Sequence, residues 1–215
     1  MQIIDLNPDQ VQVLDVIGSD SSIASYARIC MRGLDSLHDV IEEKDVTRII
    51  KQLIHRKHTS PFEFAGLTLS VKCPIFVTRQ WMRHRTFRYL ERSGRYKIST
   101  EELYFPDRVK SRVPRINTLL NTAFEEYNQM LSDGYPKQEA RAILPLGTYT
   151  EFIFQADLHN LLHFLKLRLH PSAQPEMRFY AQCVADKVAD HFPITWACFK
   201  ELELDNDRET KRYSE

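Results

Sequence analysis

The sequence predicts one predominantly helical α+β domain over residues 1–215, and three observations support this fold class. Residues 67–73 alternate strictly between apolar and polar side chains, which is the period of a strand with one face in a core. Residues 116–131 repeat apolar side chains at helical spacing, and a second long helix is expected over residues 175–191. With 43% hydrophobic and 27% charged residues, a chain of this length has the composition of a globular protein that buries a core.

The first half of the chain is expected to place short helices beside that strand. One helix is predicted over residues 22–33, and Asp45 is predicted to cap the next. The buried stripe of that second helix would consist of Ile49, Ile50, Leu53 and Ile54. Pro74 ends the strand and can open a helix over residues 75–82, after which a loop is expected.

The second half is expected to alternate helices with one further strand. The helix of residues 116–131 would end at Asp133-Gly134. Its buried face would consist of Leu119, Leu120, Phe124, Tyr127 and Leu131. Pro136 would open another helix through Ala142, and residues 147–154 are rich in strand-forming side chains. The charged residues 205–215 are expected to fray.

Asp157 is predicted to cap a leucine-rich helix that ends near Arg168. Eleven residues are about three turns, so these two charged side chains would share a face. His159 and His163 are four residues apart and fall on the other side of the helix. That spacing can hold a metal, but no third ligand has a suggestive position, so no metal site is expected. The alternative is an ordinary surface helix with one buried side.

Charge and cysteine usage narrow the class of protein. The 29 basic and 29 acidic residues cancel, which argues against a general nucleic-acid-binding protein. No apolar run approaches the ~18 residues of a membrane span, and the first residues lack the pattern of a signal peptide. The four cysteines lie far apart along the chain, which indicates reduced thiols and a cytoplasmic location.

Against this neutral background, residues 79–95 concentrate six arginines with one acid, Glu91. Arginine grips phosphate oxygens with two parallel hydrogen bonds and stays charged at any working pH. Gly94 would let a ligand approach the backbone closely. The cluster therefore indicates a site for a small polyanion such as a nucleotide, and the alternative is a solvated basic surface. Interleaved aromatic side chains also fit stacking of a base or of RNA, but packing in the core explains them at least as well.

Several motifs occur in the order found in one enzyme family. Arg83-His84-Arg85 is followed after seven residues by Ser93. Residues 58–63 (His-Thr-Ser-Pro-Phe-Glu) and 74–81 precede this pattern, and residues 140–145, 149–150, 161–168 and 173–176 follow it. Over most of its length the chain resembles the flavin-dependent thymidylate synthases, and no hydrolase, Walker or Rossmann motif competes with this interpretation.

The resemblance implies a small, mainly antiparallel sheet within the helical domain. It also implies methylation of dUMP to dTMP, with 5,10-methylenetetrahydrofolate as carbon donor and FAD, reduced by NADPH, as hydride donor. It further implies a homotetramer whose active sites are shared between subunits, with no nucleic-acid or membrane partner.

The resemblance also assigns residues. Arg168 would be catalytic and would stabilise negative charge on the uracil ring. The residues that would bind dUMP are Gln80, Trp81, Met82, Arg83, Glu91, Arg92, Ser93, Gly94, Arg95, Arg141 and Arg168. The residues that would bind FAD are Ser60, Arg83, His84, Arg85, Glu91, Asp157, His159 and His163.

The chain departs from the family pattern at a few positions near the expected flavin contacts. Arg88 and Leu90 stand where Ser and Asn are frequent, and Asp157-Leu158-His159 replaces the common Asn-x-Arg. Cys30 and Phe64 stand where Ser and His are usual. These differences leave open a related enzyme that forms a hydroxymethylated pyrimidine nucleotide. A non-catalytic nucleotide- or RNA-binding protein is the alternative from another class.

Overall fold

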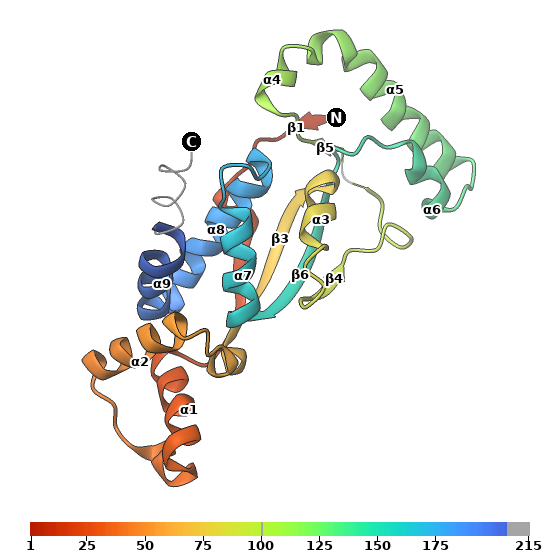
Figure 1. The fold of residues 1–215 in the computed structure, drawn as a ribbon. Coiled ribbons are helices and arrows are strands. Elements are labelled where there is room, and N and C mark those ends of the chain that lie inside the picture. Colours follow the sequence, from red (N-terminus) through yellow and green to blue (C-terminus); the bar gives the residue numbers. More distant parts are fainter. Residues whose placement is uncertain (100, 206–215) are drawn as a thin grey trace. The chain divides into compact units, whose positions relative to one another are not determined.

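The computed structural model describes residues 1–99 and 101–205, and its ribbon is drawn in Figure 1. Contacts divide the chain into two compact units. Unit 1 contains Met1–Gln12, Ser70–Arg85 and Tyr89–Phe154. Unit 2 contains Val13–Leu69, Thr86–Arg88 and the described residues from Gln155 onward.

A four-stranded sheet has the order β2-β3-β6-β4, and the division between the units falls within its strands. The strands are β2 (Val11–Ile17), β3 (Gly66–Pro74), β6 (Tyr149–Asp157) and β4 (Arg88–Glu91). A second, two-stranded sheet pairs β1 (Gln2–Ile3) in parallel with β5 (Glu102–Leu103), with Gln2 opposite Glu102. The mixture of many helices with a small, mainly antiparallel sheet confirms the predicted fold class.

The helices of unit 1 are α3 (Ile75–Trp81), α4 (Asp107–Lys110), α5 (Val113–Ser132) and α6 (Lys137–Ala140). Those of unit 2 are α1 (Asp20–Arg32), α2 (Glu43–His55), α7 (Leu158–Arg168), α8 (Pro175–His191) and α9 (Pro193–Phe199). Single turns of 3-10 helix occur at Pro8–Gln10, Leu34–His38, Ser60–Phe64 and Arg141–Ile143, and Lys200–Asp205 forms a π-helical segment.

The expected helices form with small shifts of their ends, and Asp157 caps α7 as predicted. Asp45 does not cap α2: the helix begins at Glu43 with Glu42 at its N-cap, three residues earlier than predicted, so Asp45 lies in its first turn. Leu119 is 71% exposed, because the buried face of α5 runs through its neighbour Leu120 instead. The predicted loop after α3 contains β4. The tail that is expected to fray begins at residue 205, and its residues 206–215 lie outside the described residues.

Each unit has its own buried contacts. In unit 1, the indole of Trp81 is fully buried and lies edge-on to Phe152, with ring centroids 5.3 Å apart. In unit 2, the leucine stripe of α7 is buried and α7 packs against α8. Asp20, at the start of α1, accepts hydrogen bonds from the backbone N–H groups of Ile194 and Thr195, which fixes the first turn of α9.

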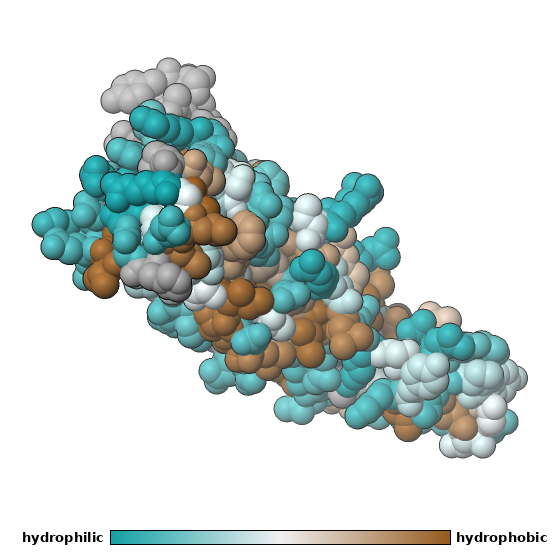
Figure 2. All heavy atoms as spheres, turned by 90° about the horizontal axis from the view of Figure 1, so that it is seen from below, coloured by the Kyte–Doolittle hydropathy of each residue, from teal (hydrophilic) through white to brown (hydrophobic). Residues whose placement is uncertain are grey.

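Apolar side chains also reach the surface. On the face shown in Figure 2 they gather in patches between polar regions. The exposed large apolar side chains of the chain include Phe64, Leu90 and Leu119. Patches of this kind are typical of surfaces that a partner covers. No helix in the described ranges is long and apolar enough to span a membrane.

Candidate functional site

The arginine cluster of residues 79–95 begins in α3, continues through a turn and β4, and ends in the loop beyond β4. Pro74 ends β3 and precedes α3, because its fixed φ suits the entry to a helix. After α3 a turn carries Arg83, His84 and Arg85. The hydroxyl of Tyr89, on β4, donates to the carbonyls of Trp81 (2.8 Å) and His84 (3.2 Å) and fixes this turn. Beyond β4, the backbone N–H of Arg92 donates to the carbonyl of Glu151 (2.8 Å) on β6.

A cavity of about 700 Å³ in unit 1 gathers six of the residues predicted to bind dUMP. These are Glu91, Arg92, Ser93, Gly94, Arg95 and Arg141. Residues 91–95 and Arg141 are far apart in the sequence, and the fold brings them together because Arg141 follows α6 directly. Lys97, Ser99 and Gln138 line the same cavity and were not predicted from the sequence.

Gly94 allows the two halves of this cavity to touch. A Cβ atom at position 94 would lie 2.6 Å from Nη1 of Arg141 and 3.0 Å from its Cδ. The backbone around Gly94 is a tight turn, in which the carbonyl of Ser93 accepts from the N–H groups of Tyr96 and Lys97. The absent side chain therefore lets the arginine lie against the loop.

The cavity is strongly positive. Among the described residues, its lining contains four cations, Arg92, Arg95, Lys97 and Arg141, and one acidic residue, Glu91. The carboxylate of Glu91 accepts a hydrogen bond from the hydroxyl of Thr150 (2.9 Å). Arg92 forms a long ion pair with Glu151 (3.4 Å). Arg95, Lys97 and Arg141 form no ion pair within the described part of the chain, so their charges are available to an anion.

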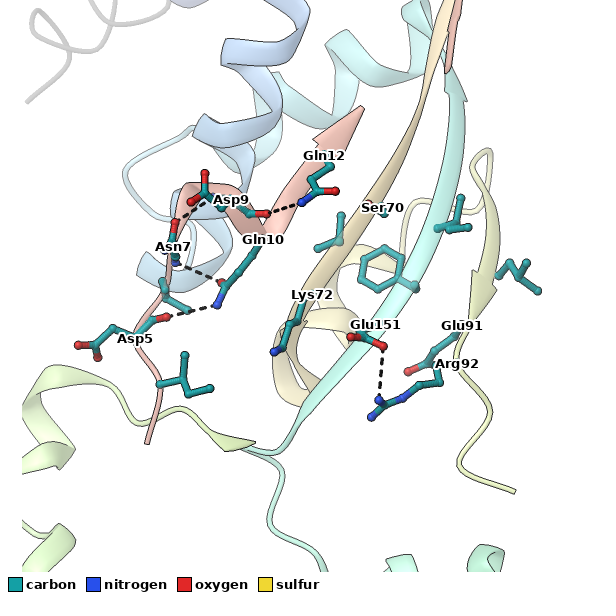
Figure 3. A pocket seen from close by; sticks show the side chains of 16 residues that line it. Asp5, Asn7, Asp9, Gln10, Gln12, Ser70, Lys72, Glu91, Arg92 and Glu151 are labelled. Atoms are coloured by element: carbon teal, nitrogen blue, oxygen red, sulfur yellow. Dashed lines mark hydrogen bonds and ion pairs between the residues drawn. The ribbon is translucent and has the colours of Figure 1, made fainter. Parts of the chain in front are cut away.

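A second cavity, of about 850 Å³, adjoins this site through Glu91 and Arg92, which line both. Figure 3 shows it between the N-terminal segment and one face of the sheet, with Arg92 reaching toward Glu151. Ser70 and Lys72 come from β3, and Leu90 comes from β4. The N-terminal residues Asp5 and Asn7 form its other wall. Sequence reasoning missed this wall because no motif or periodic pattern marks these residues.

The other residues predicted to bind dUMP or FAD do not line the 700 Å³ cavity. Gln80, Trp81, Met82 and Arg83 lie at the end of α3 or directly after it. Trp81 is a core residue, and its carbonyl accepts hydrogen bonds from the Tyr89 hydroxyl and the His84 N–H, so this predicted residue lies in the interior of unit 1. Arg83 and Arg85 are exposed and have no ion-pair partner among the described residues.

In unit 2, α7 carries the remaining predicted residues. The carboxylate of Asp157 accepts from the backbone N–H of Asn160 (2.8 Å) and from its side-chain amide (2.7 Å). This negative charge stabilises the positive N-terminus of the helix. His159 is half-buried, His163 is exposed, and Arg168 is half-buried in the last turn of the helix.

The segment around Ser60 forms a 3-10 turn with Pro61 buried in it. Ser60 is exposed. Phe64 is also exposed and packs its ring against Tyr26, with centroids 5.5 Å apart. Phe64, which stands where the family usually has His, therefore forms an aromatic pair with Tyr26 within unit 2.

The cysteines offer no activated nucleophile. Burial raises the pKa of the thiols of Cys73, Cys183 and Cys198, so these groups stay protonated at neutral pH. Cys30 is exposed, and all four are free thiols. A reaction at this site must therefore proceed without a buried thiolate.

Comparisons with known proteins agree with the motifs. The model of the family described as "Thymidylate synthase complementing protein" matches residues 12–194. Flavin-dependent thymidylate synthases from Thermus thermophilus and Pseudothermotoga lettingae are 38% and 36% identical, over 91% and 92% of this chain and 77% and 92% of their own length.

A solved structure of the UMP/dUMP methylase PolB from Streptomyces cacaoi, bound with 5-Br dUMP, superposes with a TM-score of 0.85. It is 28% identical, and the match covers 90% of this chain and 95% of that one. Another structure of the same methylase, with 5-Br UMP, gives a TM-score of 0.79. The chain therefore belongs to the thymidylate synthase complementing protein family, and the relatives that it matches are named flavin-dependent thymidylate synthases.

Proposed function

We propose that this protein methylates dUMP to dTMP in a flavin-dependent reaction, with 5,10-methylenetetrahydrofolate as carbon donor. The observation that carries the proposal is the cavity in which Ser93, Arg95 and Arg141 meet around Gly94. The cavity belongs to a chain whose relatives are named flavin-dependent thymidylate synthases and whose structural neighbour was solved with 5-Br dUMP.

In this proposal the cavity binds the phosphate of dUMP. Arg95 and Arg141 hold the phosphate oxygens, since guanidinium groups form paired, charge-assisted hydrogen bonds with them. The hydroxyl of Ser93 and the backbone at Gly94 add contacts that an arginine alone does not provide. Glu91 and Arg92 lie where the two cavities adjoin and orient the rest of the nucleotide.

The positive charges of two residues expected to bind FAD suit the diphosphate of this dinucleotide. Arg83 and Arg85 are exposed cations without an ion pair in the described ranges, which suits a diphosphate. In this proposal Arg83, His84 and Arg85 of unit 1 contact the cofactor, and Ser60, His159 and His163 of unit 2 are further cofactor-binding residues. Reduced FAD supplies the hydride of the reaction, and NADPH is the proposed reductant.

Arg168 is the proposed catalytic residue. It is half-buried on a helix whose leucine stripe is packed in the core, so the guanidinium is held by a rigid element. A fixed cation beside the uracil ring would stabilise the negative charge that develops there. The raised pKa values of the buried thiols fit a route that needs no cysteine nucleophile.

The proposal includes a homotetramer in the cytoplasm, with active sites shared between subunits and no nucleic-acid partner. Two observations support a shared site: exposed apolar side chains lie on the surface, and the residues predicted to bind dUMP do not all line one cavity. The neutral overall charge supports the absence of a nucleic-acid partner.

The test is turnover by the purified chain. Loaded with FAD, it should convert dUMP to a product with the mass of dTMP when 5,10-methylenetetrahydrofolate and NADPH are present, and dUMP should perturb the visible spectrum of the flavin. A colourless protein that takes up no FAD and leaves dUMP unchanged contradicts the proposal. A product with the mass of a hydroxymethylated nucleotide would assign the related reaction instead.

UMP is a second candidate substrate, because the structural neighbour is named a UMP/dUMP methylase and was also solved with 5-Br UMP. The same assay with UMP in place of dUMP decides this. Methylated UMP in the mass spectrum would extend the substrate range to ribonucleotides.

A further inference from the structure

Among the described residues, the 700 Å³ cavity contains a third unpaired cation besides the two arginines that we assign to the phosphate of dUMP. Three of its cations, Arg95, Lys97 and Arg141, have no ion-pair partner among residues 1–99 and 101–205. A phosphate monoester carries a charge of about −1.5 to −2 at pH 7. Arg95 and Arg141 are the two assigned to the phosphate of dUMP, so Lys97 is left without an assigned partner in that complex.

Lys97 is the cation that the monophosphate does not use. It lies outside the Ser93-Gly94-Arg95 motif, two residues beyond its end, yet its side chain lines the same cavity. Its backbone N–H donates to the carbonyl of Ser93 (3.1 Å), so the tight turn fixes the backbone of Lys97 next to the motif. The side chain of Lys97 is exposed, so a ligand can reach it.

Two neutral polar residues of the cavity favour a longer anion as well. Ser99 and Gln138 line it and can donate hydrogen bonds to oxygens beyond a first phosphate. The one carboxylate of the cavity, Glu91, accepts a hydrogen bond from Thr150. A volume of about 700 Å³ is within the range of ligand pockets and leaves room for a second phosphate group.

We propose that this cavity also binds pyrimidine nucleoside diphosphates, with Lys97 contacting the second phosphate. The inference rests on the proposed function, because it places the first phosphate where that of dUMP would lie. A diphosphate would then compete with dUMP and inhibit the enzyme. A later reaction of the class that phosphorylates nucleoside monophosphates would produce such an inhibitor from the product.

The experiment compares dUMP with dUDP by calorimetry on the full-length, FAD-loaded protein. Wild-type protein should bind dUDP at least as tightly as dUMP. Lys97→Ala should weaken dUDP by about fivefold, as expected for loss of one exposed charge-assisted contact, and dUMP by less than about twofold. Lys44→Ala is the control, because Lys44 is an exposed lysine on α2 that pairs with Glu42. This substitution should change neither affinity.

Two results would overturn the inference: dUDP binding more than about tenfold weaker than dUMP in the wild-type protein, or an equal loss of both nucleotides in Lys97→Ala. If dUMP is bound and methylated while dUDP fails to compete, only this inference fails. If dUMP itself is neither bound nor methylated, the proposed function fails and this inference fails with it.

Discussion

At the scale of single residues, Gly94 shows how one absent side chain shapes the site. Arg141 can lie against the loop only because no Cβ projects from position 94. The φ angle of Gly94 is not in the left-handed region, so the constraint at this position is space rather than backbone conformation. The sequence indicated that a ligand approaches the backbone closely at Gly94. The structure shows that the guanidinium of Arg141 lies against the backbone at this position.

Gly94→Ala should therefore damage substrate binding without unfolding the protein. The new methyl group would displace Arg141, and we expect the KM for dUMP to rise about tenfold, equivalent to loss of one charge-assisted contact. The melting temperature should stay within about 2 °C of the wild-type value. A double-mutant cycle with Arg141→Ala checks the cause, since Gly94→Ala should have little further effect once the arginine is absent.

Arg168 provides the second test at this scale. Arg168→Ala should lower kcat by roughly 10²- to 10³-fold, because a fixed cation aimed at developing charge contributes about this much. FAD retention, measured by flavin absorbance after gel filtration, should be nearly unchanged. Arg48→Ala, on α2 beside Asp45, serves as control. Equal loss of turnover and of FAD would contradict the assigned role.

At the scale of elements, hydrophobic periodicity predicted helices well but missed a short strand. The leucine stripe of α7 and the length of α8 followed directly from the sequence. β4 did not, because a four-residue strand with exposed arginine and leucine has no alternating pattern. α9 also escaped prediction, since its first turn is fixed by Asp20, far away in the sequence.

The same contrast holds for the site. The motif residues from Glu91 to Arg95 were predicted together with Arg141, and the fold joins them in one cavity. The second cavity depends on how residues 4–10 run beside the sheet, which local sequence does not determine. Lys97 was within reach of prediction, because it continues the basic run past Arg95, but only the fold shows which cations face the cavity.

Two substitutions of Asp157, the N-cap of α7, separate its structural effect from its electrostatic effect. Asp157→Ala removes the acceptor of the Asn160 N–H and should cost about 1 kcal/mol, or about 2–4 °C in Tm for a chain of this size. Asp157→Asn keeps a good cap and should leave Tm within about 1 °C. If this residue lies near FAD, removing the charge should tighten FAD binding by about two- to fivefold, measured by fluorescence titration. Asp190→Asn, exposed on α8, should have no effect.

Ion pairs connect the π-helical segment Lys200–Asp205 to α2, to the residues directly after α2, and to α7. Glu203 contacts both Lys57 and Lys166, and Glu201 contacts Lys51. Burial opposes ionisation of Glu203, but hydrogen bonds and charge from Lys166 and Lys57 outweigh it and lower the pKa of this carboxyl. A lowered folded-state pKa means that the stabilisation is complete above the ordinary value of 4.5 and is lost as pH falls through the folded value.

Glu203→Gln should consequently lower stability only where the carboxylate is charged. At pH 7 we expect a loss of about 1 kcal/mol, or about 2–4 °C in Tm. The difference from wild type should shrink steadily as the pH is lowered below 4.5 in thermal melts recorded at several pH values. A difference that is the same at pH 7 and pH 3 would show that packing, rather than charge, fastens the segment.

At the scale of the whole molecule, a shared active site makes a prediction about mixed assemblies. Arg95 lines the 700 Å³ cavity, whereas Arg83 follows α3 and does not line it. If the two contribute to one site from different subunits, Arg83→Ala and Arg95→Ala should each be nearly inactive alone yet complement each other when co-expressed. Random mixing should restore about a quarter of the sites, because each contribution is intact in half of the subunits.

Light scattering should give a mass four times that of the 25.3 kDa chain for the wild type and for each variant, which controls for loss of assembly. Reconstitution from separately purified variants, mixed after dissociation, should restore activity in proportion to subunit exchange. If co-expressed variants show only the sum of their separate activities while forming mixed tetramers, both arginines act within one subunit. The exposed apolar patches would then serve assembly alone, with no part in completing the site.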